Sequence, residues 1–494
     1  MFWCGAALCL AANQSNAAAT SATSPPNFII ILADDLGYGD VQCNNPRGKI
    51  PTPNIDRLAA GGLRFTDAHS GSAVCTPTRY GILTGRYSWR TGLQSGVLMG
   101  YDKPLIAADR VTLPGLLRKA GYTTACFGKW HLGMDIPKAT NELQIANGPT
   151  TRGFDYFFGI SASLDMAPFA FIENDHLTQA PTATKKWVRE GPAAPDFEAE
   201  DVLPELTRRT VEFIGRRAED KKPFFIYMPL NSPHTPIVPA KEWRGKSGLG
   251  DYGDFVMQTD WTVGQVKAAL DRAGLAGNTV LCVTSDNGCS PAAKVEQLEE
   301  QGHFPSAQFR GYKADIFEGG HRVPFIVQWP DRVQSGGVTD QTVCLTDFMA
   351  TFADIVGVSL PDNAAEDSIS LLPALLGKAD KPLREAVIHH SINGSFSIRQ
   401  GNWKLELCPG SGGWSSPKPG SDAEKNLPRV QLYDLAADPA EKRNLQVERP
   451  EVVSRLTGLI EQYIERGRST PGKAQPNDAP IELDKSKTKR GKSK

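Results

Sequence analysis

The sequence lacks an excess of charge of either sign. Across 494 residues, 54 Lys and Arg are balanced by 55 Asp and Glu, for a formal net charge of -1. Nucleic-acid-binding domains usually carry a strong basic surplus, so the composition argues against that class. Beyond the first residues, no run approaches the roughly 18 apolar residues needed to cross a bilayer, and we expect no membrane-spanning helix.

Two patterns that often bind zinc are also missing. No Cys-x-x-Cys pair occurs among the nine cysteines, which argues against a zinc ribbon or finger. No His-Glu-x-x-His occurs either, so a zinc site on a single helix is not expected. An exported protein could form disulfides, but the spacing does not decide any pairing, and buried thiols are the alternative.

Both ends of the chain differ in composition from its middle. Residues 1–24 carry no charge, and the apolar stretch at 2–12, followed by Ala17–Ala19, is typical of a signal peptide. The basic residue that normally begins a signal is missing, so a disordered leader is the alternative. We expect a leader at 1–24 and an exported protein, periplasmic or secreted. Residues 469–494 are polar and basic, which predicts a disordered tail, with a tether to anionic surfaces as the alternative.

The length suits one large domain with a smaller one. Short apolar runs rich in β-branched or aromatic residues predict buried strands at 27–32, 122–127, 223–230, 279–285 and 324–329. Helical patterns between them lie at 54–62, 111–121, 205–218 and 261–274. This alternation predicts an α/β catalytic domain over 25–375, with a large, mostly parallel sheet sandwiched by helices.

Residues 376–468 follow a different pattern. Three short strand-like segments, EAVIHHS, GSFSIRQG and NWKLELC, are separated by turn residues. A helix with apolar residues spaced near 3.6 follows in PEVVSRLTGLIEQYIERG. We therefore predict a C-terminal subdomain with an antiparallel sheet and a terminal helix.

Polar side chains directly follow four of the predicted strands. They are Asp34 and Asp35, Lys129 and His131, His234, and Asp286 and Asn287. Ligands of open α/β sheets bind beyond the carboxyl ends of the strands, so these residues are expected to share one rim. Taken singly, each has an ordinary alternative, since Asp-Asn-Gly is a common turn and a lone His is more often structural.

The residue types at this rim indicate a divalent cation and an anionic substrate. Three carboxylates and one amide oxygen are hard donors, which suit Ca²⁺ or Mg²⁺ better than Zn²⁺. We assign His131 and His234 to proton transfer. The cation and Lys129 would supply positive charge to the substrate.

The segment 72–87, SAVCTPTRYGILTGRY, contains a candidate nucleophile. Pro77 stands where a helix can begin, which places Cys75 at a helix N-terminus, a position that favours anions and can activate a thiol. The run from Cys75 to Arg79 resembles the C-x-P-x-R maturation motif of type I sulfatases. In that family the cysteine is oxidised to formylglycine, whose hydrate offers one hydroxyl for attack and a second for release of the sulfate. Thr78 replaces the more usual Ser.

Other segments share this resemblance, which covers about residues 27–465. They are GKWH at 128–131, SPHTP at 232–236, SDNG at 285–288, GYK at 311–313, EGG at 318–320 and LYDLAADPAEKRNL at 432–445. The resemblance implies an alkaline phosphatase-like fold and an enzyme that hydrolyses sulfate esters. It also implies a maturation partner, either a formylglycine-generating enzyme or an anaerobic sulfatase-maturating enzyme.

The resemblance further implies a role for each site residue. A calcium ion would be held by Asp34, Asp35, Asp286, Asn287 and the modified Cys75. Arg79 would hold the modified residue and offset the carboxylates. For sulfate binding and proton transfer the implied residues are Lys129, Lys313, His131 as base, His234 as acid, and Ser163, with Ser161 as an alternative.

The substrate is indicated only by the segment 302–330. It resembles bacterial carbohydrate sulfatases of the arylsulfatase A and N-acetylgalactosamine-6-sulfatase type, which favours a sulfated glycan such as 6-sulfated galactose or N-acetylgalactosamine. His303 and Arg310 would face the sugar, or else serve the scaffold. A phosphatase or phosphonate monoester hydrolase of the same fold is the competing enzyme class. An inactive glycan-binding protein is the non-enzymatic alternative.

Overall fold

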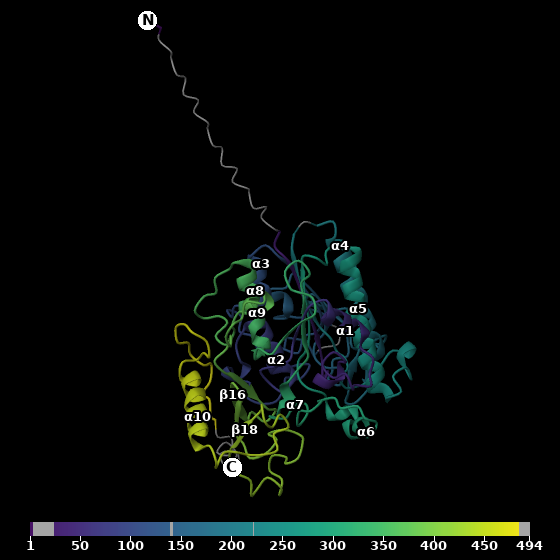
Figure 1. Cartoon of the computed structure of the whole chain (residues 1–494). Coiled ribbons are helices and arrows are strands. Elements are labelled where there is room, and N and C mark those ends of the chain that lie inside the picture. Colours follow the sequence, from purple (N-terminus) through teal and green to yellow (C-terminus); the bar gives the residue numbers. More distant parts are fainter. Residues whose placement is uncertain (3–23, 139–141, 221, 484–494) are drawn as a thin grey trace.

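The computed structural model describes residues 1–2, 24–138, 142–220 and 222–483. The predicted leader at 1–24 therefore lies almost wholly outside the described residues. A ten-stranded sheet with helices on both faces forms the larger part of the molecule (Figure 1). A smaller four-stranded sheet packs against helix α10, Pro450–Glu465.

The large sheet is mixed, and its central strands are parallel. From edge to edge its strands are β13 (Gly337–Thr339), β2 (Leu63–Phe65), β12 (Phe325–Gln328), β11 (Thr279–Ser285), β1 (Asn27–Ala33), β10 (Phe224–Pro229), β4 (Thr123–Lys129), β5 (Tyr156–Ile160), β6 (Ile172–Glu173) and β7 (His176–Leu177). The run from β11 to β5 is parallel, whereas β12 is antiparallel to β11. This confirms the predicted mixed, mostly parallel sheet and its five principal strands.

Burial explains the composition of the central strands. Every residue of β1 is buried, because neighbouring strands and helices cover both edges and both faces. Alternating polar residues are therefore absent, as expected for a parallel sheet inside an α/β sandwich. The register pairs Ala33 of β1 with Ser285 of β11 and Leu32 with Pro229 of β10, so these carboxyl ends are level.

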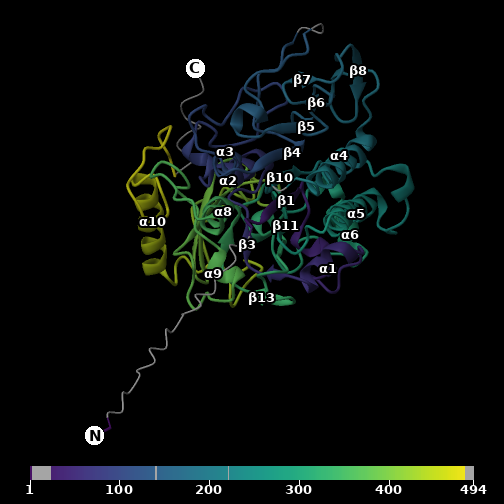
Figure 2. The same ribbon diagram turned by 90° about the horizontal axis from the view of Figure 1, so that it is seen from above.

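Two layers of helices enclose this sheet (Figure 2). One layer contains α1 (Pro53–Ala60), α4 (Val202–Arg217) and α5 (Gly250–Arg272), and the other contains α2 (Cys75–Thr84), α3 (Leu113–Lys119) and α8 (Phe348–Val356). Helix α5 begins eleven residues before the predicted 261–274 because Gly250 and Gly253 obscured its first turns in the sequence. Short helices α6 (Val295–Glu300), α7 (Glu318–His321) and α9 (Leu372–Leu375) lie in the connections.

Two small pairs of strands accompany the large sheet. They are β3 (Ala68–His69) with β14 (Val343–Cys344), and β8 (Ala183–Lys186) with β9 (Glu190–Ala193). The second pair is an antiparallel hairpin. Its tip, at Trp187 and Val188, forms part of a cavity wall.

The C-terminal sheet is antiparallel, as predicted. Its strands are β15 (Val387–His390), β16 (Phe396–Gln400), β17 (Trp403–Glu406) and β18 (Gln431–Asp434). Ile398 and Leu405 pack against Leu456 and Ile460 of α10, which explains the 3.6-residue spacing of that helix. Strand β18 was not predicted from the sequence, and it pairs antiparallel with β17 at the edge of this sheet.

The predicted disorder of the tail from residue 469 is wrong for residues 469–483. Arg86 donates hydrogen bonds to both carboxylate oxygens of Asp478 at 3.0 Å and to the carbonyl of Pro476 at 3.1 Å. Arg90 donates to Asn477 at 2.9 Å. Composition alone could not reveal this order, because buried guanidinium groups elsewhere in the chain supply the partners. Residues 484–494 lie outside the described residues.

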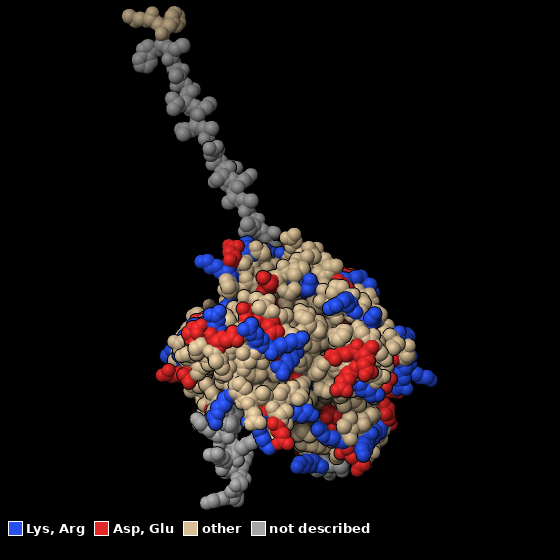
Figure 3. Space-filling view, turned by 60° about the horizontal axis from the view of Figure 1, so that its bottom comes forward, with Lys and Arg blue, Asp and Glu red and all other residues tan. Residues whose placement is uncertain are grey.

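Three further properties follow from the described residues. None of their helices combines the length and apolarity needed to traverse a bilayer. The cysteines at 43, 75, 126, 282, 289, 344 and 408 are free thiols, and all but Cys43 are buried. On the face in Figure 3, acidic and basic side chains are interspersed, in keeping with the near-zero net charge.

Candidate active site

The polar residues that follow the parallel strands lie together at one rim of the sheet. Asp34 and Asp35 come directly after β1, and Asp286 and Asn287 come directly after β11. The backbone N–H of Asp35 donates to Asp286 Oδ1 at 3.3 Å, and Asn287 Nδ2 donates to Asp35 Oδ1 at 2.7 Å. The level register of β1 and β11 brings these side chains together although about 250 residues separate them in the chain.

Two buried cations compensate this acidic group. Lys129, the last residue of β4, places Nζ 2.6 Å from Asp34 Oδ2. Arg79, from α2, directs Nε and Nη2 at Asp286 Oδ2 and lies 3.4 Å from Asp34. It also donates to the carbonyl of Lys129 at 2.8 Å, which ties α2 to the end of β4. Buried charges at such a rim require partners of this kind.

Cys75 is the first residue of α2 and is 2% exposed. Its sulfur and one oxygen each of Asp34 and Asp286 all lie within 4.8 Å of one another. Burial raises the pKa of the Cys75 thiol, although Lys129 and Lys313 act in the opposite direction. The helix N-terminus therefore does not produce a low-pKa thiol here, contrary to one expectation from the sequence. An unmodified thiol at this position is a poor nucleophile at neutral pH.

The donor atoms fit a hard divalent cation. Asp34 Oδ1, Asp35 Oδ2 and Asn287 Oδ1 are buried without a hydrogen-bond partner in the described structure. Unsatisfied buried oxygens of this kind are costly unless a cation or another donor meets them. Burial, together with the nearby Asp34 carboxylate, raises the pKa of Asp286 to about 7. The Asp34 carboxylate therefore disfavours the ionised form of Asp286, and additional positive charge at this position would favour it.

Lys313 and His234 approach the same carboxylate from other loops. Lys313 Nζ lies 2.7 Å from Asp35 Oδ1, and His234 Nε2 lies 3.7 Å from Asp35 Oδ2. His234 Nδ1 lies 2.5 Å from the carbonyl of Thr235, so Nδ1 is the donor and Nε2 faces the site. Burial, with a further contribution from Lys313, lowers the pKa of His234.

His131 is set up to accept a proton. Its Nε2 lies 2.7 Å from the carbonyl of Leu98 and must donate to it, while Nδ1 has no hydrogen-bond partner among the described residues. Burial lowers the pKa of His131 well below its ordinary value, with Lys129 as the next contributor. The ring is therefore neutral at physiological pH and presents a lone pair at Nδ1. Its φ of 55° is unusual for a non-glycine residue and is typical of functional positions.

Buried polar groups that have no hydrogen-bond partner within the described ranges also follow β5 and β10. Ser161 and Ser163, beyond β5, both have hydroxyls that no described residue pairs with, so hydrogen bonding does not distinguish between them. Asn231, two residues after the end of β10, is buried, and neither side-chain amide atom has a partner in the part of the chain that the structure describes. No role for Asn231 was predicted from the sequence, although its place beyond a parallel strand was the available signal.

The sequence left two roles open for His303, a contact with the sugar or a place in the scaffold, and its contacts support the scaffold. It is fully buried, with Nε2 2.7 Å from Asp40 and Nδ1 accepting from the backbone N–H of Lys49. Both ring nitrogens are thus used by the scaffold. Arg310 stacks on Phe317 at 3.8 Å and donates to the carbonyl of residue 441, so its contacts are also with the scaffold.

Comparison with known proteins identifies relatives over most of the chain. A family described as sulfatase matches residues 26–358, and one described as N-sulphoglucosamine sulphohydrolase, C-terminal, matches residues 312–405. The chain is 36% identical to an N-acetylgalactosamine-6-O-sulfatase of Bacteroides thetaiotaomicron, covering 88% of this chain and 92% of the relative. It is 35% identical to bovine arylsulfatase A, covering 87% and 85%.

Solved structures agree with these matches. One from Bacteroides thetaiotaomicron, described under the metabolism of multiple glycosaminoglycans, superposes with a TM-score of 0.78 at 34% identity. The superposition covers 89% of this chain and 99% of that one. A phosphonate monoester hydrolase of Agrobacterium radiobacter has a TM-score of 0.57 at 18% identity over 88% and 94% of the two chains, which indicates a shared fold alone.

Proposed function

Because the chain belongs to the sulfatase family and is a sulfuric ester hydrolase, we propose that it removes sulfate from a glycan, with Cys75 as the source of its nucleophile. The observation that carries the proposal is the position of Cys75 at the start of α2, within 4.8 Å of oxygens of Asp34 and Asp286. The name of the bacterial relative supports 6-sulfated N-acetylgalactosamine as the substrate. The alternative proposed from the sequence is 6-sulfated galactose.

We propose that the site binds Ca²⁺. Its ligands would be Asp34, Asp35, Asp286, Asn287 and residue 75. The unpaired buried oxygens support a hard cation bound by oxygen ligands. A bound cation would withdraw charge from a sulfate oxygen. Arg79 holds the Asp286 carboxylate in place beside it. Membership of the family implies both a metal ion and formylglycine. The unpaired oxygens support the metal ion.

Formylglycine hydrate at residue 75 would supply one hydroxyl for attack on sulfur and a second for release of the sulfate. Lys129 and Lys313 carry positive charge on two sides of the acidic group and are placed to bind sulfate oxygens. The unpaired Nδ1 of His131 would take the proton of the second hydroxyl as the sulfate is released. His234, with Nε2 turned into the site, donates a proton to the departing sugar oxygen once the bound sulfate favours its charged form.

The decisive experiment compares the wild-type protein with Cys75→Ala. Sulfate release from 6-sulfated N-acetylgalactosamine should fall to the background rate in the variant, because no other side chain can supply the paired hydroxyls. Cys344→Ala removes another buried thiol outside the site and serves as the control. Unchanged turnover by Cys75→Ala would contradict the proposal. Faster hydrolysis of a matched phosphate ester by the wild-type protein would instead favour the phosphatase alternative.

We also propose that the protein is exported and that a maturation enzyme converts Cys75. Peptide mass spectrometry of residue 75, after expression with and without a formylglycine-generating or anaerobic sulfatase-maturating enzyme, tests the second point. Activity should increase in proportion to the modified fraction. Activity of fully unmodified protein equal to that of modified protein would contradict it. Localisation in cell fractions of the native host tests export.

A further inference from the structure

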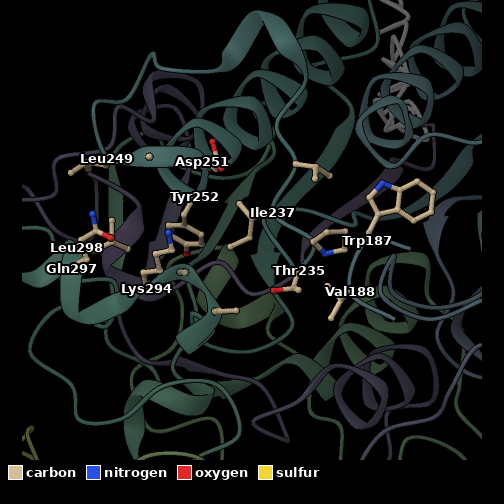
Figure 4. Close-up of a pocket in the computed structure, with 15 residues that line it drawn as sticks. Trp187, Val188, Thr235, Ile237, Leu249, Asp251, Tyr252, Lys294, Gln297 and Leu298 are labelled. Carbon is tan, nitrogen blue, oxygen red and sulfur yellow. The ribbon is translucent and has the colours of Figure 1, made fainter. Parts of the chain in front are cut away.

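We infer that a cavity beside the active site binds the sugar attached to the sulfated sugar, an inference that rests on the proposed function. The cavity has a volume of about 540 Å³. This is within the ~300–1,000 Å³ range of small-molecule sites and is far more than a sulfate requires. Four segments line it: the tip of the β8–β9 hairpin, residues 235–238, the start of α5, and residues 292–298 (Figure 4).

The cavity adjoins the side of the site where the leaving group would depart. Thr235 and Pro236 line it and directly follow His234, the proposed proton donor to the sugar oxygen. Tyr252 also lines it, and its hydroxyl oxygen lies 3.3 Å from the carbonyl oxygen of Asp35. A glycan with its sulfate between Lys129 and Lys313 and its leaving oxygen at His234 therefore extends into this cavity.

Trp187 at the hairpin tip supplies a flat apolar surface at one end of the cavity. Its ring meets Phe169 and Phe197 edge-on, at centroid distances of 4.9 Å and 5.9 Å. Arg189, two residues on, forms a 2.8 Å ion pair with Asp165 of the loop beyond β5. These contacts hold Trp187 in position, and aromatic faces of this kind suit the C–H face of a pyranose ring.

Charged and polar side chains lie at the opposite end. Figure 4 places Lys294 and Gln297 away from Trp187, with Asp251 on a neighbouring wall. Lys294 is exposed and forms no ion pair with any residue in the described ranges. It is suited to bind an anionic group on the adjoining sugar, either a carboxylate or a second sulfate. An aryl or steryl leaving group would give these polar side chains no partner.

The test compares kcat/KM for substrates that share one 6-sulfated sugar. They are the monosaccharide and disaccharides that join it to a neutral sugar, a uronic acid or a second sulfated sugar. Wild-type protein should prefer an acidic disaccharide over the monosaccharide by about tenfold or more, because binding energy remote from sulfur raises kcat/KM. The acidic disaccharide with the higher kcat/KM shows whether the cavity binds a carboxylate or a second sulfate.

Two variants separate the contributions to this preference. Trp187→Leu, which keeps an apolar side chain but removes the aromatic face, should lower the ratio of disaccharide to monosaccharide kcat/KM for every disaccharide. Lys294→Gln should lower it only for the acidic ones. Lys119→Gln is a matched control, because Lys119 is an equally exposed lysine at the end of α3. Thermal unfolding checks folding, and if Trp187→Leu does not fold, Lys294→Gln carries the test alone.

Three outcomes contradict the inference or its premise in distinguishable ways. Equal kcat/KM for monosaccharide and disaccharides, or unchanged ratios in both variants, would overturn the sugar site while leaving the sulfatase proposal intact. A higher kcat/KM for an aryl sulfate than for any of the sugar substrates would assign the cavity to apolar substrates. Failure of modified wild-type protein to release sulfate from all these compounds would overturn the proposed function itself.

Discussion

The guanidinium of Arg79 directs two nitrogens at a single carboxylate oxygen of Asp286, with Nε at 3.0 Å and Nη2 at 2.8 Å from Oδ2. Both side chains are completely buried. Oδ1 is left on the side of Asp35, where it accepts that residue's backbone N–H. One oxygen of Asp286 thus serves the ion pair, and the other faces the proposed cation site. Arg79, the last residue of the motif that begins at Cys75, therefore links helix α2 to the strand end that carries Asp286.

Arg79→Lys should impair both folding and catalysis. A lysine keeps the charge but cannot place two donors on Oδ2 while also donating to the carbonyl of Lys129. Loss of a buried ion-pair partner typically costs ~3–5 kcal/mol, and retention of the charge should place this variant at the lower end. Urea unfolding measures the stability, and sulfate release measures activity, which should fall by about 100-fold or more. Wild-type activity in this variant would contradict the assigned role.

Removal of divalent cations should abolish activity and lower stability. The unpaired oxygens of Asp34, Asp35 and Asn287 would then remain unsatisfied. Adding Ca²⁺ back at about 100 times its dissociation constant should raise the free energy of unfolding by ~2.7 kcal/mol. Thermal unfolding and sulfate release, each titrated with Ca²⁺ and separately with Mg²⁺, provide the measurement. In an Asn287→Leu variant, Ca²⁺ should raise the unfolding temperature and the rate of sulfate release less than in wild type. An equal increase with Ca²⁺ and with Mg²⁺ in the wild-type protein would argue against assigning calcium.

A buried histidine cluster should contribute acid sensitivity. His69, His321 and His389 are buried together, with the rings of His321 and His389 stacked at 3.7 Å, and burial lowers the pKa of each. Below pH ~6.5 the unfolded chain binds a proton at each histidine that the folded protein does not, so stability falls as pH falls, by up to about 1.4 kcal/mol per pH unit and group.

Comparison of wild type with His389→Asn isolates this effect. Burial raises the pKa of Glu406 and of Glu441. Protonation of these two groups makes the folded protein more stable as pH falls, but this contribution is the same in both proteins. Asparagine can keep the 3.2 Å contact with Ser397. Between pH 6.5 and 5, urea unfolding should show a shallower loss of stability in the variant than in wild type. His176→Asn, at an exposed site, is the control, and equal slopes in all three proteins would refute the prediction.

The C-terminal segment should stabilise the protein through Arg86 and Arg90. Deleting residues 476–494 removes the partners Pro476, Asn477 and Asp478. Arg86 then keeps a 3.4 Å hydrogen bond to the Tyr80 hydroxyl and a 3.4 Å ion pair with Glu366. Unfolding free energy should fall by ~2–4 kcal/mol, because buried guanidinium donors lose hydrogen bonds. Asp478→Asn should cost less, about 0.5–1 kcal/mol, since Asp478 is 46% exposed. Deletion of 484–494 alone should leave these contacts and the stability intact.

The local pattern of apolar and polar residues was sufficient to predict the strands whose ends carry the site residues. Apolar runs such as 27–32 and 279–285 predict buried strands, and the polar residues after each run are visible in the chain. Parallel strands bring their carboxyl ends to one rim, so the approach of Asp35 to Asn287 followed from strand type and boundary. The motif around Cys75 and Arg79 was likewise recognisable because its residues are consecutive or nearly so.

Only the tertiary structure decided what depends on contacts between distant segments. His303 proved to be a buried partner of Asp40 rather than a sugar contact, because its neighbours come from a loop over 250 residues away. Residues 476–478 are ordered by Arg86 and Arg90, which composition cannot reveal. The cavity between Trp187 and Lys294 exists because four separate segments meet there. Amino-acid pattern encodes local backbone conformation and burial, whereas packing of the whole chain selects which polar groups become partners.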